Sequence, residues 1–184
     1  MYGPSVARLG HIGVVVRDLD QTVDFYTRLL GLSLTERFEY GDSQTGHGTG
    51  VRAGAFVRCG SEHHCISFFV LRGEALDGNA GVGLHHIAFE MRTPKELTHK
   101  LAQLRDADVP IVNARRGGPG NQPRFYARDP DGNLLEFYWG IDSIGWQGQP
   151  RPYGPIEEID LAEFDFDEFV ARRERDAETL AKPA

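Results

Sequence analysis

Residues 9–14 read Leu-Gly-His-Ile-Gly-Val, and residues 84–89 repeat this stretch as Leu-His-His-Ile-Ala-Phe. The repeat places a histidine, His11 or His86, at the same position in each copy. The same classes of residue continue beyond both stretches, which indicates two tandem copies of one structural module. A histidine retained at equivalent positions predicts a metal ligand in each copy.

The two copies share one order of elements. Alternating and helical apolar spacings predict a strand, a helix and three further strands in each. The first copy has strands at 9–16, 32–40, 51–59 and 64–71 and a helix from Asp18 or Asp20 to about Leu30. The second has strands at 84–91, 110–114, 124–128 and 133–139 and a helix at 94–105. We therefore predict an α+β protein with βαβββ modules at residues 1–72 and 83–140, joined by a linker at 73–82.

Residues 141–184 have no counterpart in the first module. They predict an extended stretch to Pro155 and a charged helix at about 160–180, with Leu161 and Phe169 on its apolar edge. We expect this C-terminal extension to pack against the second module. The acidic run at 157–168 is more typical of a solvated face than of a metal site.

Composition excludes several classes of function. The chain has 184 residues, of which 40% are hydrophobic, enough for one globular domain or two small fused modules. Its net charge of -7 and lack of a basic run argue against a nucleic-acid partner. Its apolar runs are far shorter than the roughly 20 residues of a membrane span, and residues 1–9 lack a signal-like apolar stretch. We expect a soluble, cytoplasmic protein with no membrane partner.

The chemistry of the repeated strands supports a metal site. Side chains alternate along a strand, so His11 shares its face with Gly13 and His86 shares its face with Ala88, which leaves room for an ion. Glu136 lies inside an apolar strand, where a carboxylate is costly to bury without a positive partner, and is the third candidate ligand. Two imidazoles and one carboxylate with open positions are typical of non-haem Fe(II) oxygen chemistry, and Mn(II) accepts the same donors.

With these residues and the two-module pattern, residues 9–140 resemble the vicinal oxygen chelate superfamily, which includes glyoxalases, bleomycin resistance proteins and dioxygenases. The resemblance implies that the paired modules form a mixed β-sheet barrel around the metal. Within this superfamily the chain is similar to small type I extradiol catechol dioxygenases of aromatic compound metabolism. This similarity implies an Fe(II)-dependent oxidoreductase that adds both atoms of O2 to a small aromatic diol.

The resemblance also implies roles for three further residues. His64 ends the segment Arg-Cys-Gly-Ser-Glu-His-His at 58–64 and matches the acid–base histidine of extradiol enzymes. Tyr126 matches the tyrosine that hydrogen-bonds the catecholic oxygen. Arg116 begins Arg-Gly-Gly-Pro-Gly, which is similar to a substrate loop, although the following stretch is shorter than in those enzymes and lacks their further histidine.

Other branches of the superfamily remain open. Glyoxalase I-type sites use a carboxylate from each module, and the first-module strand at 64–69 contains none. Fosfomycin-resistance enzymes and epimerases are non-oxidative metalloenzymes, and the former also use two histidines and a glutamate. A ligand-binding resistance module needs no metal ligands at all. His64 and Tyr126 favour the dioxygenase, and exposed strand edges favour a homo-oligomer, a dimer or higher.

Overall fold

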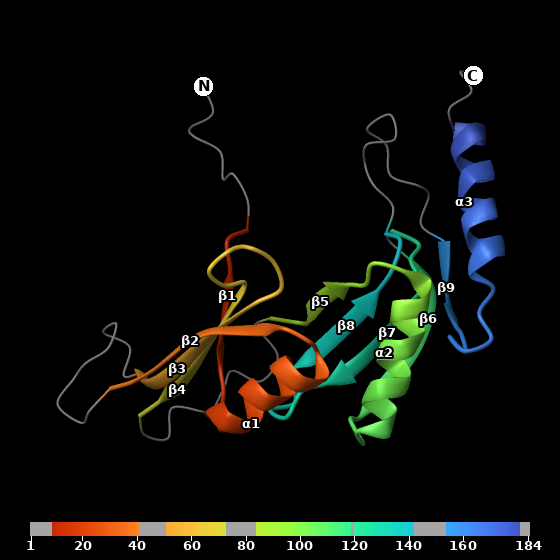
Figure 1. Ribbon diagram of the computed structural model, residues 1–184. Helices are drawn as coiled ribbons and strands as arrows, with labels where there is room; N and C mark the ends of the chain where they lie inside the picture. Colours follow the sequence, from red (N-terminus) through yellow and green to blue (C-terminus); the bar gives the residue numbers. More distant parts are fainter. Residues whose placement is uncertain (1–8, 41–50, 73–83, 119, 142–153, 181–184) are drawn as a thin grey trace, which may run out of the picture. The chain divides into compact units, whose positions relative to one another are not determined.

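The computed structural model describes residues 9–40, 51–72, 84–118, 120–141 and 154–180 (Figure 1). The chain divides into two compact units. The first unit comprises the chain up to Gly83 together with the turn Asp129–Gly132, and the second comprises the remainder. The expected linker at 73–82 and the Gly-rich loop at 41–50 lie outside the described residues.

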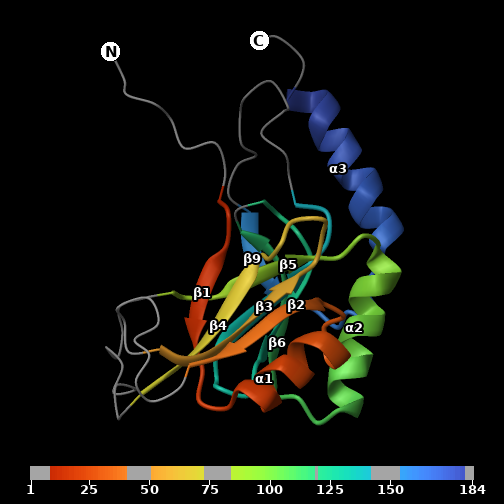
Figure 2. The same ribbon diagram turned by 60° about the vertical axis from the view of Figure 1, so that its left-hand side comes forward.

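The first unit is a four-stranded sheet with one helix. Its elements are β1 (Ile12–Val15), α1 (Leu19–Asp24), η1 (Phe25–Leu29, a π-helical continuation of α1), β2 (Ser33–Glu39), β3 (Val51–Arg58) and β4 (Ile66–Leu71). The strand order is β1-β4-β3-β2, with β1 parallel to β4 and the other pairs antiparallel (Figure 2). A parallel β1–β4 pair requires the intervening helix and hairpin as its crossover.

Local signals fix the helix of this unit. Asp18 is the N-cap, because its carboxylate accepts a hydrogen bond from the backbone N–H of Gln21 at 2.9 Å. Gly31 follows the helix with φ of 81°, the left-handed conformation predicted for it. The buried face carries Tyr26, which packs on Phe68 of β4 with ring centroids 4.7 Å apart.

The second unit repeats this plan and extends it. Its elements are β5 (Ile87–Glu90), α2 (Pro94–Asp106), β6 (Ile111–Gly118), β7 (Arg124–Arg128), β8 (Leu134–Tyr138), β9 (Gly154–Glu158) and α3 (Phe166–Leu180). The strand order is β5-β8-β7-β6-β9, with β5 parallel to β8. Its first four strands therefore follow the order of the first sheet, which confirms the α+β class and the βαβββ plan of both modules.

The C-terminal extension differs from its prediction in two ways. Its extended stretch includes β9, which pairs antiparallel with β6. Strand β6 itself runs to Gly118 rather than to residue 114 as predicted. Helix α3 begins at Phe166 and not at 160, because the carboxylate of Asp165 accepts a hydrogen bond from the Glu168 N–H and caps the helix there.

The extension packs against the second unit as expected. Leu161 and Phe169 are buried, and Phe169 contacts Trp139, the residue that follows β8, with ring centroids 6.2 Å apart. Among the described residues, no helix has the length and apolar character needed to cross a bilayer.

The turn Asp129–Gly132 is fastened to α1 and η1 inside the first unit. The Tyr26 hydroxyl donates to the Asp129 carboxylate at 3.0 Å, and both side chains are buried. Arg17 binds the Asp131 carboxylate through its backbone N–H at 3.1 Å and its guanidinium at 3.2 Å. Burial and the neighbouring Asp129 raise the pKa of Tyr26, so the phenol stays protonated and remains a donor.

Replacing Tyr26 with Phe should lower the free energy of unfolding by about 1–3 kcal/mol, because a buried carboxylate loses a hydrogen-bond donor. Denaturant unfolding of the variant and of the wild type measures the difference. Tyr40→Phe, at a half-buried tyrosine directly after β2, is the matched control. Equal losses in both variants would contradict a specific role for the Tyr26–Asp129 bond.

Candidate active site

The second unit gathers two side chains around a buried carboxylate. Glu136 of β8 is only 5% exposed, and its Oε2 lies 3.3 Å from Nε2 of His86, the residue that precedes β5. Strand register explains the meeting, because Glu136 pairs with Ala88 of β5 on one side and with Tyr126 of β7 on the other. His86 and Tyr126 lie near each other, with ring centroids 6.0 Å apart. We call His86, Tyr126 and Glu136 the Glu136 cluster.

The Glu136 cluster fits a divalent metal. Ligand bonds of about 2.1 Å at right angles place two donor atoms about 3 Å apart, close to the observed separation of the His86 nitrogen and the Glu136 oxygen. The other ring nitrogen of His86, Nδ1, lies 2.7 Å from Nδ1 of His85. That contact orients the His86 ring and leaves Nε2 facing the carboxylate, the arrangement in which an outer residue aligns a metal-binding histidine.

Two residues that the sequence reasoning missed complete this site. The Gln122 amide donates to Glu136 Oε1 at 3.4 Å, and the Arg124 guanidinium Nε donates to the Tyr126 hydroxyl at 3.0 Å. Both side chains are buried. Strand parity could have identified Arg124, because residues 124 and 126 of β7 share a face.

The pKa of Tyr126 reflects these neighbours. Burial raises it above its ordinary value, and the hydrogen bond to Glu136 raises it further, whereas Arg124 lowers it. Tyr126 is therefore a protonated phenol, with Glu136 on one side and Arg124 on the other.

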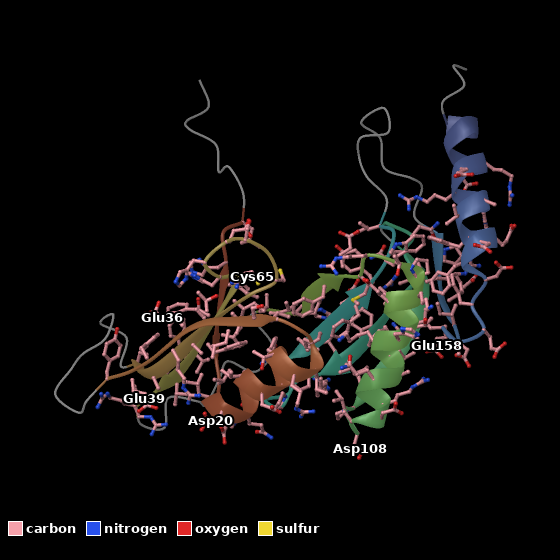
Figure 3. All side chains as sticks on the ribbon, in the orientation of Figure 1. Asp20, Glu36, Glu39, Cys65, Asp108 and Glu158 are labelled. Atoms are coloured by element: carbon pink, nitrogen blue, oxygen red, sulfur yellow. The ribbon has the colours of Figure 1, made fainter. Side chains whose placement is uncertain are left out.

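The first unit brings together the other two predicted residues. His11 precedes β1 and His64 precedes β4, and their ring centroids are 4.5 Å apart. The Nδ1 of His64 lies 2.9 Å from Nδ1 of His63, whose Nε2 is 3.5 Å from the carboxylate of Glu36 on β2 (labelled in Figure 3). Burial lowers the pKa of His64, and the nearby His11 and His63 lower it further.

A mainly apolar pocket of about 610 Å³ adjoins the His11–His64 pair. Its described lining consists of His11, Gly13, Val15, Val51, Phe56, His64, Ser67, Phe69 and Leu71. Phe56 and Phe69 meet edge to face, with ring centroids 6.4 Å apart. None of these described lining residues is an acid, a lysine or an arginine.

Ser67 occupies the position in the first module that Glu136 occupies in the second. Ser67 pairs with Gly13 of β1, just as Glu136 pairs with Ala88 of β5. Its hydroxyl is buried and has no hydrogen-bond partner among the described residues. The first module thus has no carboxylate at the position where a glyoxalase I-type site would need one.

Arg116 lies elsewhere in the second unit. Its neighbour Arg115 pairs with Arg124, so Arg116 faces the opposite side of the sheet from Tyr126. Its guanidinium binds the Glu157 carboxylate of β9 at 2.7 Å and lines a cavity of about 430 Å³ beside α3. We therefore leave Arg116 out of the proposed substrate site.

The predicted residues thus form two groups: His86, Tyr126 and Glu136 in one unit, and His11 and His64 in the other. Across the described ranges, no three His, Cys, Asp or Glu side chains gather into a complete metal-binding group.

Comparison with known proteins identifies the family. Residues 8–137 match the model of the Glyoxalase/Bleomycin resistance protein/Dioxygenase superfamily, and the chain belongs to this superfamily. The chain is 38% identical over 106 residues to biphenyl-2,3-diol 1,2-dioxygenase 3 of Rhodococcus globerulus, covering 56% of this chain and 53% of that protein. It thus spans about half the length of this dioxygenase, and 43% of the 3-methylcatechol 2,3-dioxygenase of Pseudomonas putida.

A relative named as a transferase also matches. The chain is 29% identical over 133 residues to glutathione transferase FosA of Serratia marcescens, covering 72% of this chain and 80% of FosA. Among solved structures, a glyoxylase/bleomycin resistance protein/dioxygenase domain from Frankia sp. EAN1pec superposes with a TM-score of 0.57 at 23% identity, covering 74% of this chain and 99% of that one. The structural likeness shows the same fold.

Replacing His85 with Phe should weaken binding of Mn(II) or Fe(II) about tenfold or more, because the His86 ring loses the contact that aligns it. His85→Asn offers a hydrogen-bond acceptor in a similar place and should lose less. Titration against a competing chelator measures both affinities. His99→Phe, at an exposed histidine of α2, is the control. Unchanged affinity in His85→Phe would show that His85 does not align a metal ligand.

Proposed function

We propose that this chain is an Fe(II)-dependent extradiol dioxygenase, which opens the ring of a catechol next to its two hydroxyl groups and places both atoms of O2 in the product. The observation that carries the proposal is the Glu136 cluster, in which a buried carboxylate, an imidazole nitrogen 3.3 Å away and a phenol meet on one sheet face. Membership of a superfamily with dioxygenase members, and the likeness to the Rhodococcus enzyme, support it.

His11, His86 and Glu136 would hold the metal in this proposal. Fe(II) in such a site would supply electron transfer between the catechol and dioxygen, and Mn(II) accepts the same donors. Three protein ligands leave positions open for the two oxygens of a catechol. Reaction of a catechol with O2 to a ring-opened product balances without an external reductant.

Tyr126 and His64 would handle hydrogen bonds and protons. The Tyr126 hydroxyl would donate to a catechol oxygen and so stabilise the negative charge that develops there. His64 would accept and return a proton at Nε2, because Nδ1 contacts His63. Its lowered pKa keeps the imidazole neutral near pH 7, which suits it to accept the proton.

The apolar pocket supports a particular class of catechol. Phe56 and Phe69 offer aromatic surface beside His11 and His64. The Phe69 ring packs close to Gly13, where an added Cβ would lie only 3.3 Å from the ring. A carboxylate or ammonium substituent would lose water there without gaining an ionic partner from the described lining. We therefore propose an uncharged catechol with an apolar substituent, such as the biphenyl-2,3-diol in the name of the Rhodococcus relative.

The likeness to FosA favours one second candidate, a non-oxidative metalloenzyme that uses Mn(II) or another divalent ion. Such an enzyme consumes no O2, so oxygen uptake with a catechol separates the two candidate functions.

Association into a homo-oligomer is a separate proposal. Strand β2 lies at the end of the first sheet and is a candidate contact edge, which sedimentation of the full chain would test.

Two substitutions should separate metal binding from proton transfer. Glu136→Ala should abolish iron retention, because the buried anionic ligand is removed. His64→Phe should retain iron but slow turnover by about a hundredfold or more, the range expected for losing a general acid–base. Iron content after desalting and oxygen uptake are the two measurements, with the exposed Glu39→Ala as a control. A fully iron-loaded Glu136→Ala protein or a fully active His64→Phe protein would contradict the respective role.

The substrate class is tested by placing a cation in the pocket. Wild-type protein should prefer 3-phenylcatechol, which is another name for biphenyl-2,3-diol, to a carboxylated catechol. The expected preference is at least about tenfold in kcat/KM, equivalent to roughly 1.4 kcal/mol. Val15→Arg should shrink this preference, because Val15 lines the pocket and is 44% exposed, so an arginine can be accommodated there and can pair with a carboxylate. Val112 is 45% exposed, lies on β6 and is not among the described residues that line the pocket. Val112→Arg is therefore the matched control. A wild-type preference for the carboxylated substrate would refute the substrate class and leave ring cleavage intact.

A further inference from the structure

Arg124 is a buried cation with an unusual set of partners. The side chain is 6% exposed. Its Nε donates to the Tyr126 hydroxyl at 3.0 Å, and its Nη1 donates to the carbonyl oxygens of Gly117 at 2.8 Å and Gln122 at 3.1 Å. No carboxylate in the described ranges accepts a hydrogen bond from it, although buried arginines are usually paired with an acid.

This arrangement determines which way the Tyr126 hydroxyl points. A phenol has one proton to donate and accepts through its lone pairs. Because Arg124 can only donate, it occupies the accepting side of the Tyr126 oxygen, and the O–H must turn elsewhere. An acceptor is available nearby, because the Glu136 carboxylate lies on the cross-strand partner of Tyr126 in β8.

We propose that Arg124 is a positioning residue that makes Tyr126 a hydrogen-bond donor toward the oxygen of the substrate. This inference rests on the proposed function, in which Glu136 binds the metal and Tyr126 contacts a catechol. Without Arg124, the Tyr126 hydroxyl could rotate and accept a hydrogen bond from a neighbour. It would then donate to the substrate in only a fraction of the molecules.

The C-terminal extension holds Arg124 in place. Gly117, which accepts from Arg124, has φ of 87°, and a Cβ at this position would overlap the carbonyl oxygen of Pro155 on β9. The cross-strand ion pair of Arg116 with Glu157 fastens the same part of β6 to β9. Strand β9 lies beyond residue 137, where the match to the superfamily model ends, so the extension adds a support for Tyr126 to the shared fold.

Arg124→Lys keeps the charge and loses the Nε–H that contacts Tyr126. In full-length, iron-loaded protein without oxygen, this variant should keep its iron and bind 3-phenylcatechol about tenfold or more weakly, as expected for a hydrogen bond from a charged group. Tyr126→Phe should show a similar loss, and the double variant should lose little more than either single variant. Arg128→Lys, at the exposed end of β7, is the matched control and should bind like the wild type.

Additive losses in the double variant, or wild-type affinity in Arg124→Lys, would overturn the positioning role. Should Arg124→Lys not fold, Gly117→Ala displaces β9 and is expected to weaken catechol binding with iron content unchanged, and not to weaken it further when combined with Tyr126→Phe. Failure of the wild type to bind any catechol would count against the proposed function. The Arg124–Tyr126 contact is then judged by a double-mutant cycle on the unfolding free energy of the metal-free protein, where absence of coupling would refute it.

Discussion

The carboxylate of Glu136 is the constraint from which the second unit's site follows. It lies in β8 and is only 5% exposed, so little water can reach its charge. Strand register brings partners to it from the neighbouring strands, with Tyr126 opposite on β7 and His86 just ahead of β5. Burying a carboxylate and an imidazole nitrogen in an apolar core costs free energy, whereas the same two groups are favourable ligands for a metal ion.

Duplication of the module did not duplicate its chemistry. At the position equivalent to Glu136, the first unit has Ser67, and a mainly apolar pocket adjoins it. One unit therefore supplies anionic and phenolic groups, and the other supplies imidazoles beside an aromatic surface. Under the proposed function, the second unit supplies Glu136, His86 and Tyr126, and the first unit supplies His11, His64 and the apolar surface that selects the substrate.

Periodicity predicted most of the fold, because strands and helices that bury one face must repeat at intervals that the sequence displays. It could not predict that β9 pairs with β6, since that pairing joins residues about 40 apart and depends on the whole sheet being formed. The capping side chain of Asp165, and not apolar spacing, sets where α3 begins. Site residues showed the same division. Repetition and burial cost pointed to His11, His86 and Glu136, which remain predictions as ligands. Strand parity places Arg124 on the face of Tyr126, but the roles of Arg124 and His85 depend on side-chain contacts that spacing alone does not specify.

The most direct test of the proposed function is a single turnover of the iron-loaded protein with 3-phenylcatechol and isotopically labelled dioxygen, followed by mass spectrometry of the product. An extradiol dioxygenase should consume one equivalent of dioxygen and give a ring-opened product that carries both labelled atoms. A catechol recovered intact with iron bound and no oxygen consumed would contradict ring cleavage and leave the non-oxidative metalloenzyme as the better account.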